Sequence, residues 1–429
     1  MPAPSSPTWL LKNGLVARCF PAEVMRADIR VVRGQIADVG EGLRPIYPNE
    51  EVVDCAGRLI MPGFVAAHTH LAETIALGCA SPRPARERIA AAHTADSLYY
   101  SVLAGAVAAL RSGVTTVIDS VSAPNAVRGS LDVVAYALEE VGIRGVVSYA
   151  TSDLEGADAA RFAIEEHQTF LGRYRGQRCA ALVGGLASHA LGDETLTRLT
   201  ELAARYAVGM HLQIGETEQD ALITEQQYGL GLCERLFEAG ALVPRTLLAN
   251  GAHLAFEEIA VAREAGCWFA YCPRRNMLDG SGHPPLEHLP PDRTVLGTDA
   301  MSLDILSELE LAYLKMCDEH HPVTVGRVAH MLTNTQRLAA QCLGVSLGTL
   351  QSGAAADLVM LDYDPPMPIT TANLHEHVVH GLAGAAVSDV MVNGLFLVQR
   401  GALTNGAIAS QLARARAEAT ALWQRIGQP

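Results

Sequence analysis

Short apolar runs alternate with amphipathic segments through the middle of the chain. Eight such runs are spaced as strands, at Leu59–Val65, Thr115–Ile118, Arg144–Ser148, Ala180–Leu186, Gly209–Ile214, Thr246–Ala249, Cys267–Tyr271 and Thr294–Leu296. Helical patterns fill the gaps, for example at Ser97–Arg111, Leu131–Val141, Glu194–Tyr206, Cys233–Ala239 and Glu257–Ala265. Eight strands alternating with helices are typical of an α/β protein with a (β/α)₈ TIM-type barrel, because parallel neighbours need a crossover helix.

The two ends of the chain follow a different pattern. Residues 29–40 alternate apolar and polar side chains with a glycine at each bend, which predicts a β-hairpin. Near the other end, Asp357–Asp362 is a short apolar strand, and Val387–Val398 contains two strands around the Asn393-Gly394 turn. Because these pieces are short and lie far apart in sequence, we expect them to pair into one small β-sandwich domain formed by both termini.

These patterns divide the chain into three parts. We expect the composite β-sandwich domain to use residues 1–60 and 355–405, and the catalytic barrel to use residues 61–354. Residues 406–429 follow as a C-terminal surface helix. The side chains expected to dock this helix are Leu412, Ala419, Leu422 and Trp423.

Composition and charge narrow the function. Apolar residues make up 49% of the chain and charged residues 18%, as in a folded protein with a large core. The formal net charge is −14 and no run of Lys or Arg occurs, which argues against binding to nucleic acid or to an anionic membrane surface. The first residues lack the features of a signal peptide, and the nine cysteines form no CxxC pair. We expect a cytoplasmic protein with free thiols that acts on a small molecule.

Two histidines at the end of the first predicted barrel strand are the clearest sign of chemistry. His68 and His70 are two residues apart in an extended segment, so their imidazoles project to the same face. Active sites of barrels lie at the carboxyl ends of the strands, where these residues stand. Two converging neutral imidazoles suit one divalent metal ion, with zinc preferred over iron or manganese.

Two carboxylates follow other barrel strands. Asp299 comes directly after the eighth strand, where it can bind the same metal ion and accept a proton, although a helix N-cap is the alternative reading. Glu216 follows the fifth strand, where a carboxylate can move protons to and from a substrate nitrogen. We therefore expect Glu216 and Asp299 to be catalytic.

These motifs resemble the amidohydrolase superfamily over nearly the whole chain, within the branch of cytosine and guanine deaminases and triazine hydrolases. Among its members the sequence is most similar to the SsnA-type aminohydrolases. The segments that carry the resemblance are Pro62–His70, Ser112–Asp119, Ser122–Asp132, Leu296–Asp299 and Ala354–Pro366. The resemblance implies a metal held by His68, His70 and Asp299, with Glu216 as the proton shuttle.

The chain departs from the family pattern at three positions. The family's metal-binding histidine of strand five is Gln213 here, and its strand-six histidine is Asn250. The strand-seven His-Asn-Pro pattern reads Tyr271-Cys272-Pro273. An amide oxygen is a poorer ligand than imidazole, so we expect Gln213 to help bind the metal only weakly. Asn250 cannot titrate near neutral pH, but it can hydrogen-bond to a substrate.

Other polar residues near the strand ends have less certain roles. We expect Asn250, His253, Arg275 and Asn276 to contact the substrate. Guanidinium groups at Arg274 and Arg275 would favour a carbonyl- or carboxylate-bearing molecule, although surface positions are an equal alternative. For His189 and His211, structural roles are the more common outcome.

Three functions are compatible with this sequence. The leading hypothesis is a metal-dependent amidohydrolase or aminohydrolase that cleaves a C–N bond of a small heterocyclic or amidine-like substrate. The second is an isomerase, lyase or cyclase that uses Glu216 and Asp299 in acid–base chemistry with little or no metal dependence. The third is a non-catalytic ligand-binding relative. A homodimer is compatible with all three.

Overall fold

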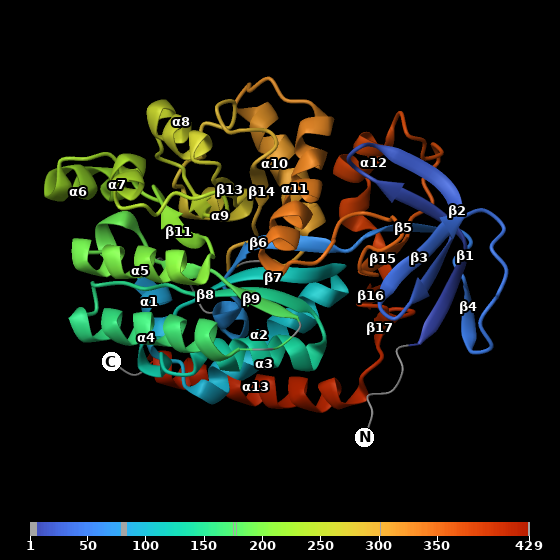
Figure 1. The fold of residues 1–429 in the computed structure, drawn as a ribbon, viewed down its shortest axis with the longest axis horizontal. Coiled ribbons are helices and arrows are strands. Elements are labelled where there is room, and N and C mark those ends of the chain that lie inside the picture. The colour runs from blue at the N-terminus through green and yellow to red at the C-terminus, as the bar shows by residue number, and fades with distance from the viewer. Residues whose placement is uncertain (1–6, 79–83, 175, 177, 301, 428–429) are drawn as a thin grey trace.

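A computed structural model describes residues 7–78, 84–174, 176, 178–300 and 302–427. A parallel barrel surrounded by helices forms the larger part of the molecule, and a mixed, mostly antiparallel sheet lies at its side (Figure 1). The predicted α/β architecture, a barrel with a β-domain made by both termini, is confirmed.

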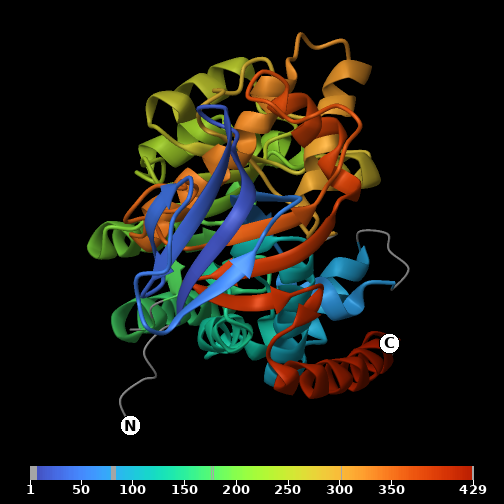
Figure 2. The ribbon, with the colours of Figure 1, turned by 90° about the vertical axis from the view of Figure 1, so that its right-hand side faces the viewer.

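Nine strands form the terminal sheet, in the order β18-β17-β16-β15-β5-β1-β2-β3, with β4 also paired to β1. Their bounds are β1 Thr8–Arg18, β2 Glu23–Val32, β3 Gln35–Gly40, β4 Glu50–Asp54, β5 Arg58–Pro62, β15 Leu358–Asp362, β16 Ala386–Val392, β17 Leu395–Gln399 and β18 Ala402–Leu403. The two ends meet where β5 pairs antiparallel with β15, in the register Met360↔Ile60. Figure 2 shows the N-terminal strands in blue beside the C-terminal strands in red.

The sheet has its own apolar core, to which strands from both ends contribute. Ile29 of β2, Ile60 of β5 and Met360 of β15 are all fully buried in it. Asn393 and Gly394 join β16 to β17, and both have positive φ, 50° and 73°. This is the backbone geometry that a two-residue Asn-Gly hairpin requires, as the sequence predicts.

The described residues of the barrel form nine parallel strands in two hydrogen-bonded groups, β6-β7-β8-β9 and β10-β11-β12-β13-β14. Their bounds are β6 Phe64–Thr69, β7 Val114–Val121, β8 Arg144–Tyr149, β9 Cys179–Ala181, β10 Val183–Gly185, β11 Met210–Ile214, β12 Leu247–Asn250, β13 Trp268–Tyr271 and β14 Thr294–Leu296. β9 and β10 are one predicted strand interrupted at Leu182. The groups approach each other through the isolated bridges Thr69↔Asp299 and Thr151↔Gly185.

The first predicted barrel strand is also divided into two. The run Leu59–Val65 divides at Gly63 into β5, which belongs to the terminal sheet, and β6, which opens the barrel. A Cβ at Gly63 would lie 2.4 Å from side-chain atoms of Thr115, so only glycine allows the chain to cross between the two sheets here.

Helices cover the outside of the barrel (Figure 1). They are α1 Pro84–Ala91, α2 Ala95–Arg111, α3 Ser130–Val141, α4 Ala157–Arg173, α5 Asp193–Tyr206, α6 Glu218–Tyr228, α7 Leu232–Glu238, α8 Phe256–Glu264, α9 Pro273–Asp279, α10 Ile305–Asp318, α11 Val325–Leu343, α12 Leu374–His380 and α13 Gly406–Gly427. Short 3₁₀ helices lie at Leu71–Ala76, Pro124–Ala126, Ser188–Ala190 and Leu382–Gly384. Within the described residues, no helix is both long and apolar enough to span a membrane.

The C-terminal helix α13 packs against α2 of the barrel wall. Its buried side chains are Ile408, Ala415 and Leu422, spaced seven residues apart on one face. Trp423 is 52% exposed, so its predicted docking role is wrong. Trp423 directly follows Leu422, and consecutive residues of a helix point about 100° apart.

Candidate active site

Three potential metal ligands converge at the carboxyl ends of β6 and β14. One ligand atom each from His68, His70 and Asp299 lies within 4.8 Å of the others, and all three residues are buried. Nε2 of His68 is 3.6 Å from Oδ2 of Asp299, and Nε2 of His70 is 3.9 Å from the same oxygen. The sequence prediction that these residues lie together therefore agrees with the geometry.

Backbone hydrogen bonds hold the two strand ends in this position. The amides of Thr298 and Asp299 both donate to the carbonyl of His68, at 3.0 and 2.9 Å. The amide of His70 donates to the carbonyl of Asp299 at 3.2 Å. Asp299 has a φ of 51°, a left-handed conformation that a non-glycine residue adopts at some energetic cost. The carboxylate is thus fixed by its backbone as well as by its side-chain contacts.

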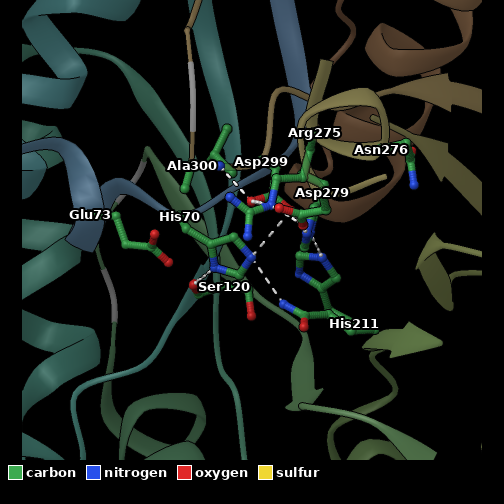
Figure 3. Close-up of polar contacts among 12 residues, drawn as sticks. His70, Glu73, Ser120, His211, Arg275, Asn276, Asp279, Asp299 and Ala300 are labelled. Carbon is green, nitrogen blue, oxygen red and sulfur yellow. Dashed lines mark hydrogen bonds and ion pairs between the residues drawn. The ribbon is translucent and has the colours of Figure 1, made fainter. Parts of the chain in front are cut away.

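The second nitrogen of His70 determines which side of its ring faces the site. Nδ1 lies 2.7 Å from the carbonyl oxygen of Ser120, as Figure 3 shows. A carbonyl only accepts, so Nδ1 carries the proton and Nε2 presents a lone pair to Asp299. Burial, and next the charge of Arg86, hold the pKa of His70 well below its usual value, which keeps the ring neutral.

Gln213 lies at the end of β11, beside these ligands. Its side-chain Nε2 is 2.9 Å from Nε2 of His70, and the residue is 5% exposed. Rotating the amide by half a turn would present its oxygen instead, since the two orientations have the same shape. His211, two residues earlier, lies behind His68, with 2.8 Å between its Nε2 and Nδ1 of His68. It does not take the place of the missing strand-five ligand.

The donor set fits one divalent cation. Nε2 of His68 and Oδ2 of Asp299 are buried and have no hydrogen-bond partner among the described residues. Such groups cost free energy unless a ligand satisfies them. Two ligand atoms on a tetrahedral zinc ion are about 3.4 Å apart when each bond is about 2.1 Å, close to the observed 3.6 and 3.9 Å. The three residues can therefore hold a metal ion with little rearrangement.

Two arginines, of which the sequence singled out only one, approach the other oxygen of Asp299. Nη2 of Arg86 is 3.2 Å from Oδ1, and Nε of Arg275 is 3.7 Å from it. Each guanidinium also has its own carboxylate, Glu73 at 2.5 Å for Arg86 and Asp279 at 2.8 Å for Arg275. Burial raises the pKa of Asp299, but Arg86 and the two histidines outweigh it and hold that pKa well below its usual value.

Arg86 and Glu73 are residues that the sequence analysis missed. Glu73 lies in the 3₁₀ helix after β6, and Arg86 lies near the start of α1. Neither residue follows an apolar strand run or belongs to a short motif, so no local signal marks them.

Glu216 lies just after β11, in the turn that begins α6. It is partly exposed, and its charge acts on both Arg86 and Cys272, which places it on the same side of the barrel as Asp299. Its amide donates to Oδ2 of Asp220 at 2.9 Å, and Asp220 also pairs with His189 at 3.1 Å. Asp220 and His189 therefore shape the turn that carries Glu216.

The four predicted substrate contacts have different surroundings. Asn250 is buried at the end of β12 with a φ of 74°, and neither of its amide atoms has a hydrogen-bond partner among the described residues. His253 is half-buried, and its amide donates to the carbonyl of Gly215 at 2.9 Å. Arg275 joins the Asp299 cluster, whereas Asn276 lies apart from it (Figure 3).

Arg274, next to Arg275, points elsewhere. Its Nε is 2.6 Å from Oε1 of Glu308 on α10, and its amide donates to the same carboxylate at 3.2 Å. The two adjacent guanidiniums therefore have different partners. Arg274 links helix α9 to α10, and Arg275 contacts Asp299 in the site.

Comparison with known proteins shows which family the chain resembles. A family model described as "Amidohydrolase family" matches residues 59–397. The 5-methylthioadenosine/S-adenosylhomocysteine deaminase of Pyrococcus furiosus is 27% identical over 91% of this chain and 95% of its own length. The 5′-deoxyadenosine deaminase of Methanothermobacter thermautotrophicus is 28% identical over 89% of this chain and 91% of its own.

Solved structures show the same fold. A zinc-bound adenosine deaminase from Xanthomonas campestris superimposes with a TM-score of 0.82 at 23% identity, covering 98% of this chain and 100% of that one. Atrazine chlorohydrolase TrzN from Arthrobacter aurescens TC1, complexed with zinc, gives 0.82 at 22% identity, covering 96% and 100%. The predicted class, hydrolases that act on C–N bonds other than peptide bonds, is confirmed by the deaminase relatives. The chain belongs to the amidohydrolase family.

Proposed function

We propose that this protein is a metal-dependent aminohydrolase that replaces an amino group of an adenosine-like heterocycle with a hydroxyl or oxo group and releases ammonia. The observation that carries the proposal is the convergence of His68, His70 and Asp299, with two of the three ligand atoms buried and unsatisfied. The names of the deaminase relatives supply the substrate class.

Each site residue has a role in this reaction. His68, His70 and Asp299 would hold the metal ion, and Gln213 lies beside them as a weak fourth donor. A divalent ion bound there supplies Lewis acidity and lowers the pKa of water. Glu216 moves a proton to the departing nitrogen from the barrel rim. The pKa of His70 lies well below its usual value because the ring is buried, which suits a metal ligand that must be neutral.

The remaining polar groups recognise the substrate. Asn250 offers a buried amide donor and acceptor side by side, which complements the N=C–NH₂ edge of an amidine. Arg275 is held by Asp279 and Asp299, and its other N–H groups can donate to a carbonyl or hydroxyl of the substrate. We extend the same proposal to His253 and Asn276, as residues that shape the rim.

Metal analysis and a substrate assay test the proposal together. Purified protein should carry about one zinc ion per chain and should release ammonia from 5′-deoxyadenosine, 5′-methylthioadenosine or S-adenosylhomocysteine. His68→Ala should lose both properties, whereas His167→Ala, which alters a buried histidine of helix α4, should keep them. Zinc far below one per chain in both the wild type and His68→Ala would contradict the metal site. Activity that survives chelators would favour the acid–base alternative.

Cellular context and assembly belong to the same proposal. We place the protein in the cytoplasm, because all eight cysteines among the described residues are free thiols and six of them are buried. We also propose that the composite β-sandwich domain and the barrel form one unit, and that the unit assembles as a homodimer. Light scattering after size-exclusion chromatography would measure the mass against 45.6 kDa for one chain.

A further inference from the structure

A line of buried hydrogen bonds runs from the back of His68 into the barrel. Nδ1 of His68 lies 2.8 Å from Nε2 of His211, and Nδ1 of His211 lies 3.0 Å from Oγ of Ser148. Oγ of Ser148 lies 3.1 Å from the carbonyl oxygen of Asp119. All four residues are at most 1% exposed, and they come from β6, β11, β8 and β7.

The direction of these bonds follows from the last acceptor. A carbonyl oxygen cannot donate a hydrogen bond. The hydroxyl of Ser148 must therefore donate its single proton to the carbonyl oxygen of Asp119. Oγ of Ser148 is then an acceptor, and Nδ1 of His211 must be its donor. A neutral imidazole carries one proton, so Nε2 of His211 has a lone pair and must accept from Nδ1 of His68.

The consequence appears at the opposite side of the His68 ring. With its proton on Nδ1, His68 presents the lone pair of Nε2 to Oδ2 of Asp299, 3.6 Å away. Only this tautomer can bind a metal ion through Nε2. The partner of His70 has a comparable effect, but there a backbone carbonyl fixes the ring directly.

We propose that His211 and Ser148 are positioning residues that set the tautomer and ring orientation of His68. They thereby leave the Nε2 lone pair of His68 free to bind the metal ion. The metal-binding part of this inference rests on the proposed function above. Groups that hydrogen-bond to metal-binding histidines raise metal affinity by fixing the ligand, and their loss weakens binding by about 10–100-fold.

Zinc affinity of matched variants tests the proposal. His211→Leu removes the acceptor and fills its place with an apolar side chain. We expect the zinc dissociation constant to rise about 10–100-fold, as measured by competition with a chelating dye. His211→Gln restores a side-chain acceptor near the position of Nε2 and should recover most of the loss. Ser148→Ala should weaken zinc binding less, because His211 can then populate both of its neutral tautomers. An unchanged dissociation constant in His211→Leu would overturn the inference.

A second readout needs no metal and separates this inference from the proposed function. Nitrogen NMR of histidine-labelled, metal-free protein distinguishes the two neutral tautomers of an imidazole. His68 should have a protonated Nδ1 in the wild type and in His211→Gln, and a mixture in His211→Leu. A single unchanged tautomer in His211→Leu would overturn the inference even if zinc binds. Failure of the wild type to bind zinc would instead overturn the proposed function, while the NMR result would still decide the role of His211.

The control variant addresses simple loss of folding. His167 is fully buried on helix α4, where its Nε2 accepts from the amide of Gly184 at 3.1 Å. His167→Leu should therefore destabilise the barrel to a similar degree as His211→Leu. It should leave both the zinc dissociation constant and the His68 tautomer unchanged. Equal weakening of zinc binding by the two leucine variants would show a general structural effect and contradict the proposed role.

Discussion

Nη2 of Arg86 lies 3.2 Å from Oδ1 of Asp299, on the side of the carboxylate that faces away from the two histidines. Arg86 therefore occupies one oxygen and leaves the other, Oδ2, turned toward His68 and His70. Because Glu73 holds the same guanidinium at 2.5 Å, the arginine cannot easily rotate away. Arg86 thus orients the carboxylate of Asp299 through its contact with Oδ1.

Replacing Arg86 by methionine should disorient Asp299. We expect kcat/KM to fall about 10–100-fold, because a ligating carboxylate depends on the groups that hydrogen-bond to it. Arg86→Lys should retain part of the activity, since an ammonium group keeps the charge but cannot bridge Glu73 and Asp299 with a planar fork. Steady-state ammonia release measures both.

The control for this variant lies on the same helix. Arg88 is exposed, and it contacts the carbonyl of Ile426 in the C-terminal helix. Arg88→Met should keep wild-type kinetics, although it removes the same charge two residues away. Equal loss of activity in the two variants would mean that helix α1, rather than the contact with Asp299, matters.

The sequence could predict the residues that follow regular patterns. His68 and His70 could be recognised because they extend a strand with a period of two, and Asp299 because it ends another strand. The barrel and the two-ended β-domain followed from the same alternation. In each case a short local pattern has only one common structural solution.

Contacts between residues far apart in the sequence could not be predicted. Arg86 reaches Asp299 across 213 residues of sequence, and nothing local marks either end of that contact. The division of the first strand at Gly63 depends on the neighbouring side chain of Thr115, which belongs to another strand. His211 was expected to be structural, and only the three-dimensional hydrogen bonds reveal which side of His68 it contacts.

Glu216 provides the sharpest test of catalysis. Glu216→Gln keeps the size of the side chain but removes its ability to accept and deliver a proton. We expect kcat to fall by about 10²–10⁴-fold, while the zinc content stays near that of the wild type. Glu218→Gln, an exposed change two residues further along, should have little effect. A fully active Glu216→Gln variant would contradict the role of Glu216 as the proton shuttle.

Glu308 should make stability depend on pH. It is fully buried on α10, and burial raises its pKa from 4.5 to about 7 in spite of the bond from Arg274. Between these two pH values the folded state holds a proton that the unfolded state has lost. Stability should therefore fall as pH rises from 4.5 to 7, by up to about 3 kcal/mol from this residue.

The measurement is urea unfolding at several pH values across this range. Glu308→Gln has no proton to lose at this position. The free energy of unfolding of this variant should therefore rise relative to that of the wild type as pH rises. Glu310→Gln, a change to a half-buried residue of the same helix, should keep the wild-type slope. Parallel curves for Glu308→Gln and the wild type would show that Glu308 stays ionised in the folded protein.

Arg144 joins the barrel to the terminal sheet through a buried ion pair. Its Nε and Nη2 lie 2.7 and 3.0 Å from the two carboxylate oxygens of Asp357, which precedes β15, and both side chains are at most 4% exposed. Asp357 also accepts from the amide of Asn393 at 2.8 Å. The carboxylate is therefore shared between the barrel strand β8 and the hairpin of β16 and β17.

Removing the arginine should leave a buried charge without its counterion. Arg144→Met should lower the free energy of unfolding by about 3–5 kcal/mol, whereas the double variant with Asp357→Asn should lose less than the sum of the two single changes. Arg161→Met breaks exposed ion pairs on α4, which solvent screens, and should leave stability nearly unchanged. Urea unfolding of the wild type, the two single variants and the double variant measures the coupling energy between Arg144 and Asp357. Strictly additive losses would mean that barrel and terminal sheet are held together by apolar packing instead of this ion pair.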